Sequence, residues 1–111
     1  MCLAAARATM PWVVLLISTY DLGRQPFGLA SAAAALRAAG ADVVCADLAK
    51  ERLSAAAVAR AAAIAFFLPM HTATRLAMPV IDHVRAVNPR ARLIAYGLYA
   101  PLNATLLREH G

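Results

Sequence analysis

The sequence contains only two cysteines, and their positions exclude most of the chemistry that thiols support. Cys2 lies near the start of the chain and Cys45 lies inside a strand-like run. Neither belongs to a C-x-x-C pair or to a Cys/His cluster with metal-ligand spacing, so no metal or iron–sulfur site can be assembled from them. Cys45 is expected to be a small core residue. Nothing requires an oxidising compartment, so the cytoplasm is the expected location.

Charged residues are also scarce, at 15% of the chain against 62% for hydrophobic residues. The formal net charge is +5, but the arginines are scattered singly, and only Arg90 and Arg92 lie close together. A nucleic-acid-binding surface gathers its cations on one face and adds aromatic side chains for stacking. Aromatic residues make up 6% of this chain and lie mostly inside apolar runs. Nucleic-acid binding is therefore not expected.

Long hydrophobic runs are absent, since none approaches the roughly 18 apolar residues that a membrane-spanning helix needs. The run "PWVVLLIS" after Arg7 imitates a signal peptide, but Asp21 and Arg24 follow it at once. It is better read as a buried strand, and no membrane association is expected. The 111 residues suffice for one small domain, placed at residues 12–111 after an extension without fixed structure at residues 1–11.

The residues that are present alternate between strand-like and helix-like segments four times. Gly40, Ser54 and Asn103 stand where a C-cap and two N-caps belong, and Pro79 either kinks its helix or begins it. The expected strands are Trp12–Ser18, Ala41–Leu48, Ala63–Leu68 and Arg92–Tyr96, and the expected helices cover 29–40, 54–62, 71–89 and 103–111. This alternation predicts an α/β, flavodoxin-like or Rossmann-like parallel sheet with strand order 2-1-3-4. The chain stops where such folds place a fifth strand, so a truncated sheet with an open edge at the fourth strand is expected.

A ligand of such a sheet lies at the carboxyl ends of the strands, near the switch point between the first and third. Any strand-end loop is polar and rich in turns, so an ordinary structural role remains an alternative for each candidate. The candidate residues there are Ser18, Thr19, Tyr20, Asp21, Met70, His71, Thr72, Gly97, Leu98 and Tyr99.

The sequence lacks the motifs of the ligands and reactions that are common in this fold. The chain has no G-x-G-x-x-G and no G-x-x-x-x-G-K-[ST], and Asp21 is the only acidic residue at the first and third strand ends. His71 could act as a catalytic base only with an orienting carboxylate and a nucleophile nearby, for which Asp21 and Ser18 are candidates. His83 and His110 are expected to face solvent.

The stretch "QPFGLASAAAALRAAGADVVCADL", residues 25–48, resembles the entry to the cobalamin-binding-type domain at the N-terminus of many radical S-adenosylmethionine (radical SAM) enzymes. There a Pro-x-Gly-Leu turn feeds a helix that ends in Arg-x-x-Gly. Together with "FFLPMHTATRLA" and "NPRARLIAYGLYAPLNA", it resembles one bacterial subgroup, whose members carry a short Cys-containing C-terminal tail. The resemblance covers nearly the whole chain from Trp12 onward.

The resemblance implies a corrinoid, cobalamin, with its ring or nucleotide tail over the strand ends. The implied contacts are Thr19, Tyr20, Asp21, Gly28, Met70, His71, Thr72, Gly97, Leu98 and Tyr99. The family's D-x-H-x-x-G is incomplete, because no histidine stands two residues after Asp21, so no lower ligand of the cobalt is evident. Leu98 replaces the second glycine of the family's fourth-strand turn.

The chain also lacks C-x-x-x-C-x-x-C, so it carries no [4Fe–4S] cluster and is expected to be inactive as an enzyme alone. Its implied partner is a radical SAM catalytic domain, or another protein surface, at the open sheet edge. Three alternatives remain: a scaffolding domain of the same fold without corrinoid, a small independent hydrolase using His71, and a truncated remnant without activity.

Overall fold

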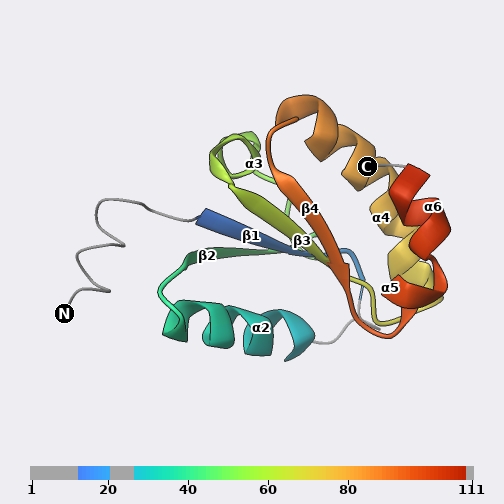
Figure 1. The fold of residues 1–111 in the computed structure, drawn as a ribbon, viewed down its shortest axis with the longest axis horizontal. Coiled ribbons are helices and arrows are strands. Elements are labelled where there is room, and N and C mark those ends of the chain that lie inside the picture. Colours follow the sequence, from blue (N-terminus) through green and yellow to red (C-terminus); the bar gives the residue numbers. More distant parts are fainter. Residues whose placement is uncertain (1–12, 21–26, 110–111) are drawn as a thin grey trace.

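The computed structural model describes residues 13–20 and 27–109. The strands β1 (Val13–Ser18), β2 (Asp42–Asp47), β3 (Ala63–Phe67) and β4 (Arg92–Tyr96) form one parallel sheet in the order β2-β1-β3-β4. Figure 1 shows this sheet edge-on between its helices. The α/β, flavodoxin-like fold and the strand order 2-1-3-4 predicted from the sequence are confirmed.

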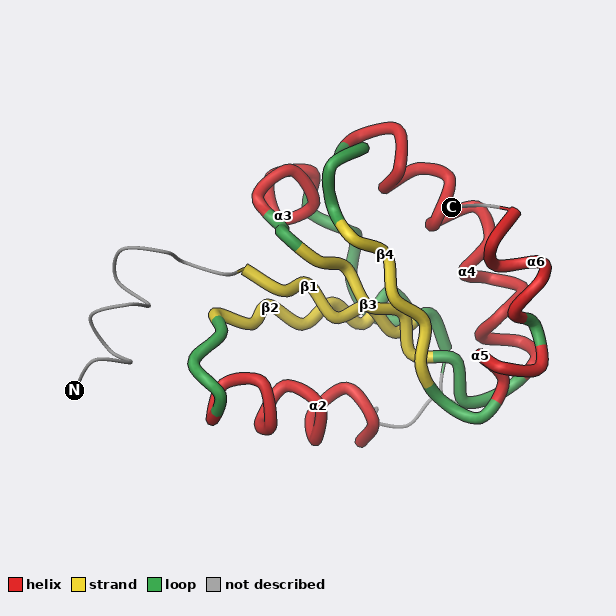
Figure 2. Tube along the Cα trace, viewed as in Figure 1, coloured by secondary structure: helices red, strands yellow, loops and turns green. Residues whose placement is uncertain are grey.

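The helices cover the two faces of the sheet unequally. They are α2 (Phe27–Ala38), α3 (Ala55–Arg60), α4 (His71–Val87), α5 (Tyr99–Leu102) and α6 (Ala104–Glu109). Figures 1 and 2 show α2 alone on one face, while α3 and α4 lie on the other with α5 and α6 beside them. The "α4 face" and the "α2 face" below are named accordingly.

The central strand β1 is buried on both faces because its side chains alternate between them. Leu15 and Ile17 belong to the larger core cluster on the α4 face, together with Phe66 and Val84. Leu16 belongs to the smaller cluster, with residues of α2 and β3. Burial on both sides explains why this strand reads as an unbroken apolar run.

Two predicted helix caps are confirmed. Gly40 has φ 105°, and the Ala41 N–H donates to the Leu36 carbonyl across it at 3.0 Å. The Ser54 hydroxyl accepts from the Ala57 N–H at 3.2 Å at the start of α3. The helix α4 runs through Pro79, so the alternative in which that proline begins the helix is wrong.

The prediction that Cys45 is a core residue is wrong. Cys45 is exposed and not in the core, because β2 is an edge strand with β1 as its only neighbour in the described sheet. Asn103 lies directly before α6, where the sequence predicts its N-cap, and its carbonyl accepts from the Leu107 N–H at 2.9 Å. Its side-chain amide donates to the Tyr99 carbonyl at 2.8 Å and so closes the unexpected short helix α5. No helix within 13–20 and 27–109 is long and apolar enough to cross a membrane.

Candidate functional site

Hydrogen bonds join three loops at the carboxyl edge of the sheet. The Thr19 hydroxyl, just after β1, donates to the Ala73 carbonyl in the first turn of α4 at 2.7 Å. The Leu68 N–H, after β3, donates to the Tyr96 carbonyl at 2.8 Å, and the Tyr99 N–H donates back to the Leu68 carbonyl at 3.1 Å. The structure therefore brings the predicted loops after β1, β3 and β4 together at one edge.

The residues of this edge differ widely in exposure. Leu98 is 72% exposed, and His71 and Thr72 are also exposed. Met70, Tyr20, Gly28, Gly97 and Tyr99 are half-buried, and Thr19 is buried. We call the four residues Met70, His71, Thr72 and Leu98 the edge surface. It combines two apolar side chains with two groups that can form hydrogen bonds.

The edge surface includes the N-terminal end of α4. Met70 is the N-cap and makes no side-chain capping bond. The first backbone bond of the helix runs from the Thr74 N–H to the Met70 carbonyl at 3.1 Å, so the preceding N–H groups have no partner within the helix. These groups and the helix dipole favour an acceptor or an anion at this end.

The two predicted contact glycines pack against the protein itself. Gly97 has φ 107°, and a Cβ there would lie 2.8 Å from the Leu68 carbonyl oxygen. A Cβ on Gly28 would collide with the ring of Phe67. Both glycines therefore allow one backbone segment to approach its neighbour closely, which differs from opening space for a ligand.

Aromatic side chains fill the region between α2 and the ends of β3 and β4. The Phe67 and Tyr96 ring centroids are 5.3 Å apart, and the Tyr96 hydroxyl donates to the Gly28 carbonyl at 3.0 Å. Burial raises the pKa of Tyr96 to about 12, with a smaller contribution from the Cys45 charge. Because these rings lie against Gly28, a ligand group inserted beneath the first turn of α2 has no room among the described residues.

Ser18 and His71 are not arranged as a nucleophile and base. Ser18 has the same strand parity as Leu16, which places its side chain on the α2 face, and it is fully buried. His71 is exposed at the first residue of α4, a helix of the opposite face. Asp21, the third member of the hypothetical set, lies outside the described residues. Ser18 has no access to a substrate, so the geometry gives the hydrolase alternative no support.

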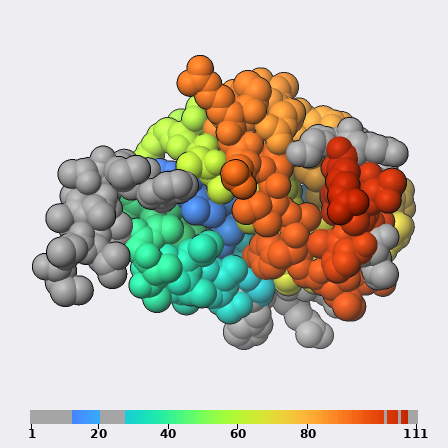
Figure 3. All heavy atoms as spheres, viewed as in Figure 1, coloured from blue at the N-terminus to red at the C-terminus, as the bar shows by residue number. Residues whose placement is uncertain are grey.

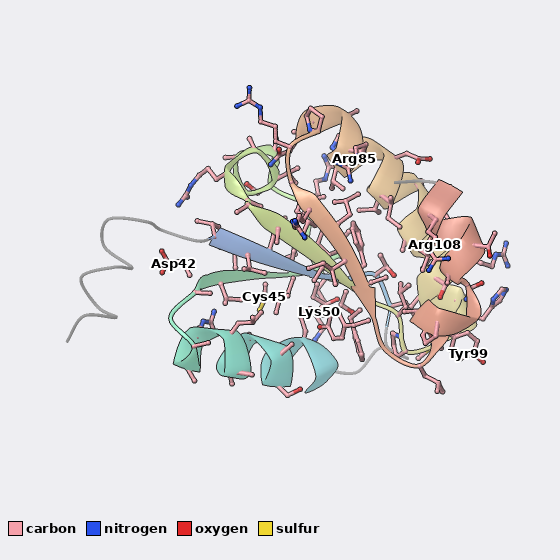
Figure 4. All side chains as sticks on the ribbon, viewed as in Figure 1. Asp42, Cys45, Lys50, Arg85, Tyr99 and Arg108 are labelled. Carbon is pink, nitrogen blue, oxygen red and sulfur yellow. The ribbon has the colours of Figure 1, made fainter. Side chains whose placement is uncertain are left out.

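A separate groove of about 500 Å³ lies between α2 and β2, where Figure 4 labels Cys45 and Lys50. Burial of the Cys45 sulfur raises its pKa, although the residue as a whole is exposed and the positive charge of Arg37 acts in the opposite direction. Two of the charged groups here have partners: Arg37 donates to the Val43 carbonyl, and Glu51 accepts from the Asp47 N–H. A thiol with a raised pKa is a poor nucleophile.

Sequence reasoning missed two features of the edge: the Phe67–Tyr96 pair, and the Ser18 hydroxyl, which has no hydrogen-bond partner among the described residues. Strand alternation carried a usable signal for the first, because Phe67 shares the parity of Ala65, which packs under α2. The sequence could not have indicated the unsatisfied Ser18 hydroxyl, since hydrogen-bond partners depend on tertiary contacts. No protein-family model, curated protein or solved structure matches the chain, so the site rests on its own geometry.

Proposed function

We propose that the chain is the cobalamin-binding-type module of a radical SAM protein and that its edge surface contacts a corrinoid from one side. One observation carries the proposal: the loops that the resemblance implies as contacts, after β1, β3 and β4, are tied together at the switch point of a 2-1-3-4 sheet. Crevices at this place in open α/β sheets are where ligands bind.

The chemistry of the edge surface suits a large, flat, amphipathic ligand. Leu98 and Met70 supply apolar area, and Thr72, His71 and the N–H groups in the first turn of α4 supply a few hydrogen bonds. When bound, a corrinoid supplies cobalt-centred chemistry. The residues of this chain would bind and orient its ring, and no described residue is assigned as a lower ligand of the cobalt.

The packing around Gly28 restricts where a corrinoid could bind. A nucleotide tail inserted beneath the first turn of α2 does not fit, because the Phe67 ring lies against Gly28 and Tyr96 is bonded to the same residue. The proposal is therefore restricted to a corrinoid lying over the strand ends. Radical chemistry would belong to a catalytic domain that carries the cluster cysteines absent from this chain.

Titration of the purified chain with hydroxocobalamin, followed by the visible spectrum and by retention after gel filtration, tests this proposal. Leu98→Asp should weaken binding about tenfold, because it places a charge against an apolar ligand face. Val87→Asp is the matched control: Val87 is 38% exposed at the far end of α4 and should leave binding unchanged. An unchanged spectrum with no retained cobalamin would reject the corrinoid assignment.

A second candidate function is an interaction domain of the same fold that binds no corrinoid. The observation in its favour is the filled space beneath the first turn of α2, which leaves only the outer surface for a ligand at the carboxyl edge of the sheet. It predicts no response to hydroxocobalamin and a partner-binding surface elsewhere on the sheet.

A further inference from the structure

The outer edge of β4 has unpaired backbone groups. The Arg92 N–H donates to the Ala62 carbonyl, and the Tyr96 carbonyl accepts from the Leu68 N–H, so both residues bond toward β3. Bonding residues alternate along a parallel strand, so the N–H and C=O groups of Leu93 and Ala95 point away from the sheet. No hydrogen bond joins these groups to another described residue.

A groove runs along this edge between β4 and α6. Two adjoining hollows, of about 160 and 480 Å³, share Ala95, Leu107 and Arg108 as lining residues. The first reaches Phe66 and Ile81 of the core, and the second continues to Gly97. Figure 3 shows β4 and α6 on the same visible face of the molecule. The groove thus offers an unpaired strand edge beside an apolar wall.

The opposite side of the same edge is also apolar. Ile94 is 47% exposed on the α2 face, where α2 packs against β1 and β3. A strand placed next to β4 would send alternate side chains toward Leu107 on one face and toward Ile94 on the other. An extended segment with alternating residues could therefore pack apolar side chains on Ile94 and present its other side chains to Leu107 and Arg108.

Arg108 is the charged residue among those that line the two hollows. Arg108 lies on α6 beside β4, as Figure 4 shows, and Arg92 is exposed at the start of the strand. No hydrogen bond or ion pair joins either guanidinium to another described residue. A carboxylate on the bound segment would pair with them, whereas a second copy of a chain with net charge +5 would bring like charges together.

We propose that the outer edge of β4 binds an extended segment of a partner protein by parallel or antiparallel strand addition. The segment is apolar at alternate positions and carries a carboxylate that faces Arg108. Main-chain bonds to Leu93 and Ala95 give affinity, and the contacts with Leu107, Ile94 and Arg108 give selectivity. This inference goes beyond the proposed corrinoid contact and does not depend on it.

The test uses two fluorescently labelled peptides of about six residues, the usual strand length. One alternates valine with glutamate, and the other replaces each glutamate by lysine. Fluorescence anisotropy with the full chain, without corrinoid, should show binding of the glutamate peptide at least about tenfold tighter than binding of the lysine peptide. Arg108→Glu should reduce or reverse this preference.

Ala95→Pro separates backbone pairing from side-chain contact. Proline removes the outward N–H of Ala95 and breaks no bond to β3, which is the position where edge strands accept proline. Binding should fall about tenfold or more. Ala95→Ser keeps the N–H at nearly the same size and should bind as the unmodified chain does. Thermal unfolding of both variants checks that each remains folded.

Hydrogen exchange provides a readout on the free chain and on the complex. The amides of Leu93 and Ala95 should exchange fast, those of Ile94 and Tyr96 slowly, and the glutamate peptide should slow the first pair. No binding at about 1 mM peptide, or undiminished binding by a folded Ala95→Pro variant, would overturn the proposal. A concentration-dependent dimer that Ala95→Pro abolishes would also overturn it, because the occupant would then be a second copy.

Discussion

Ser18 is fully buried, yet its hydroxyl has no hydrogen-bond partner among the described residues. A buried polar group without a partner costs free energy because it has given up its bonds to water. Ser18→Ala should therefore leave the free energy of unfolding unchanged or raise it by about 1 kcal/mol. Urea denaturation measures the change.

A clear loss of stability in Ser18→Ala would contradict this account, since it would mean that the hydroxyl is bonded. Thr19→Val is the contrasting variant, because it removes a hydroxyl that donates to the Ala73 carbonyl at 2.7 Å. It should cost about 1–2 kcal/mol.

Tyr96 makes stability depend on alkaline pH. Its pKa is raised from 10.0 to about 12 in the folded chain by burial, so the unfolded chain loses the phenolic proton first. The stability contributed by this group is complete below pH 10 and declines as the pH rises from 10 toward 12. Urea denaturation across this interval, together with absorbance of the phenolate, measures it. Tyr96→Phe should flatten this part of the profile, and an identical profile in the variant would contradict the assignment.

Residue roles at the candidate site followed from the sequence only in part. Strand ends and fold order were sufficient to place Thr19, His71 and Leu98 at one edge, because parallel strands bring their carboxyl ends together. The packing roles of Gly28 and Gly97 were not predictable from the sequence. Gly28 packs against Phe67 of β3 and Gly97 against Leu68 just after β3, and both neighbours are distant in the sequence.

Asn88 links two helices of the α4 face. Its buried amide donates to the carbonyls of Val58 and Ala61 at 2.8 and 2.9 Å, and its oxygen accepts from the Ala91 N–H at 3.1 Å. Asn88→Ala removes these side-chain bonds, which should cost about 1–3 kcal/mol, although the Val58 carbonyl still accepts from the Ala61 N–H at 3.3 Å and the Ala91 N–H still donates to the Asn88 carbonyl at 3.4 Å. Chemical denaturation measures the loss. Asn103→Ala, at a half-buried amide with one bond, should cost less, and equal losses would contradict a special role for Asn88.

Element boundaries were predicted well where a local signal marks them. Local contacts within a few residues determine the helix ends at Gly40 and Ser54 and the apolar runs of β1 and β3. These boundaries can therefore be predicted without tertiary information. The helix α5 and the exposure of Cys45 were missed for the opposite reason. Whether a short segment turns into a helix, or a strand lies at an edge, depends on which other elements cover it.

The molecule as a whole is asymmetric about its sheet. The cluster on the α4 face holds most of the buried apolar residues, whereas the α2 face has a buried cluster of Leu16, Leu29, Ala33 and Ala65. The residues that α2 contributes to this cluster are mainly alanine and leucine. Small apolar contacts contribute little free energy per residue, so we expect α2 to detach more easily than α4.

Native-state hydrogen exchange tests this expectation. Amides of α2 should open at a lower free energy than those of α4 and β1, by about 1–3 kcal/mol. Leu29→Ala should lower the opening free energy of α2 more than that of α4. Uniform protection across both helices would show that the two faces open together.

The central position of β1 has a consequence for biosynthesis. The ribosome makes the middle strand of this sheet first, and its partners on the two sides are made later, β2 before β3. Val13 can pair with Asp42 as soon as the first crossover has emerged, but Val14 meets Ala63 only after a second crossover. Between these two moments one side of a very apolar strand is unpaired, which is the condition in which nascent chains need protection by a chaperone.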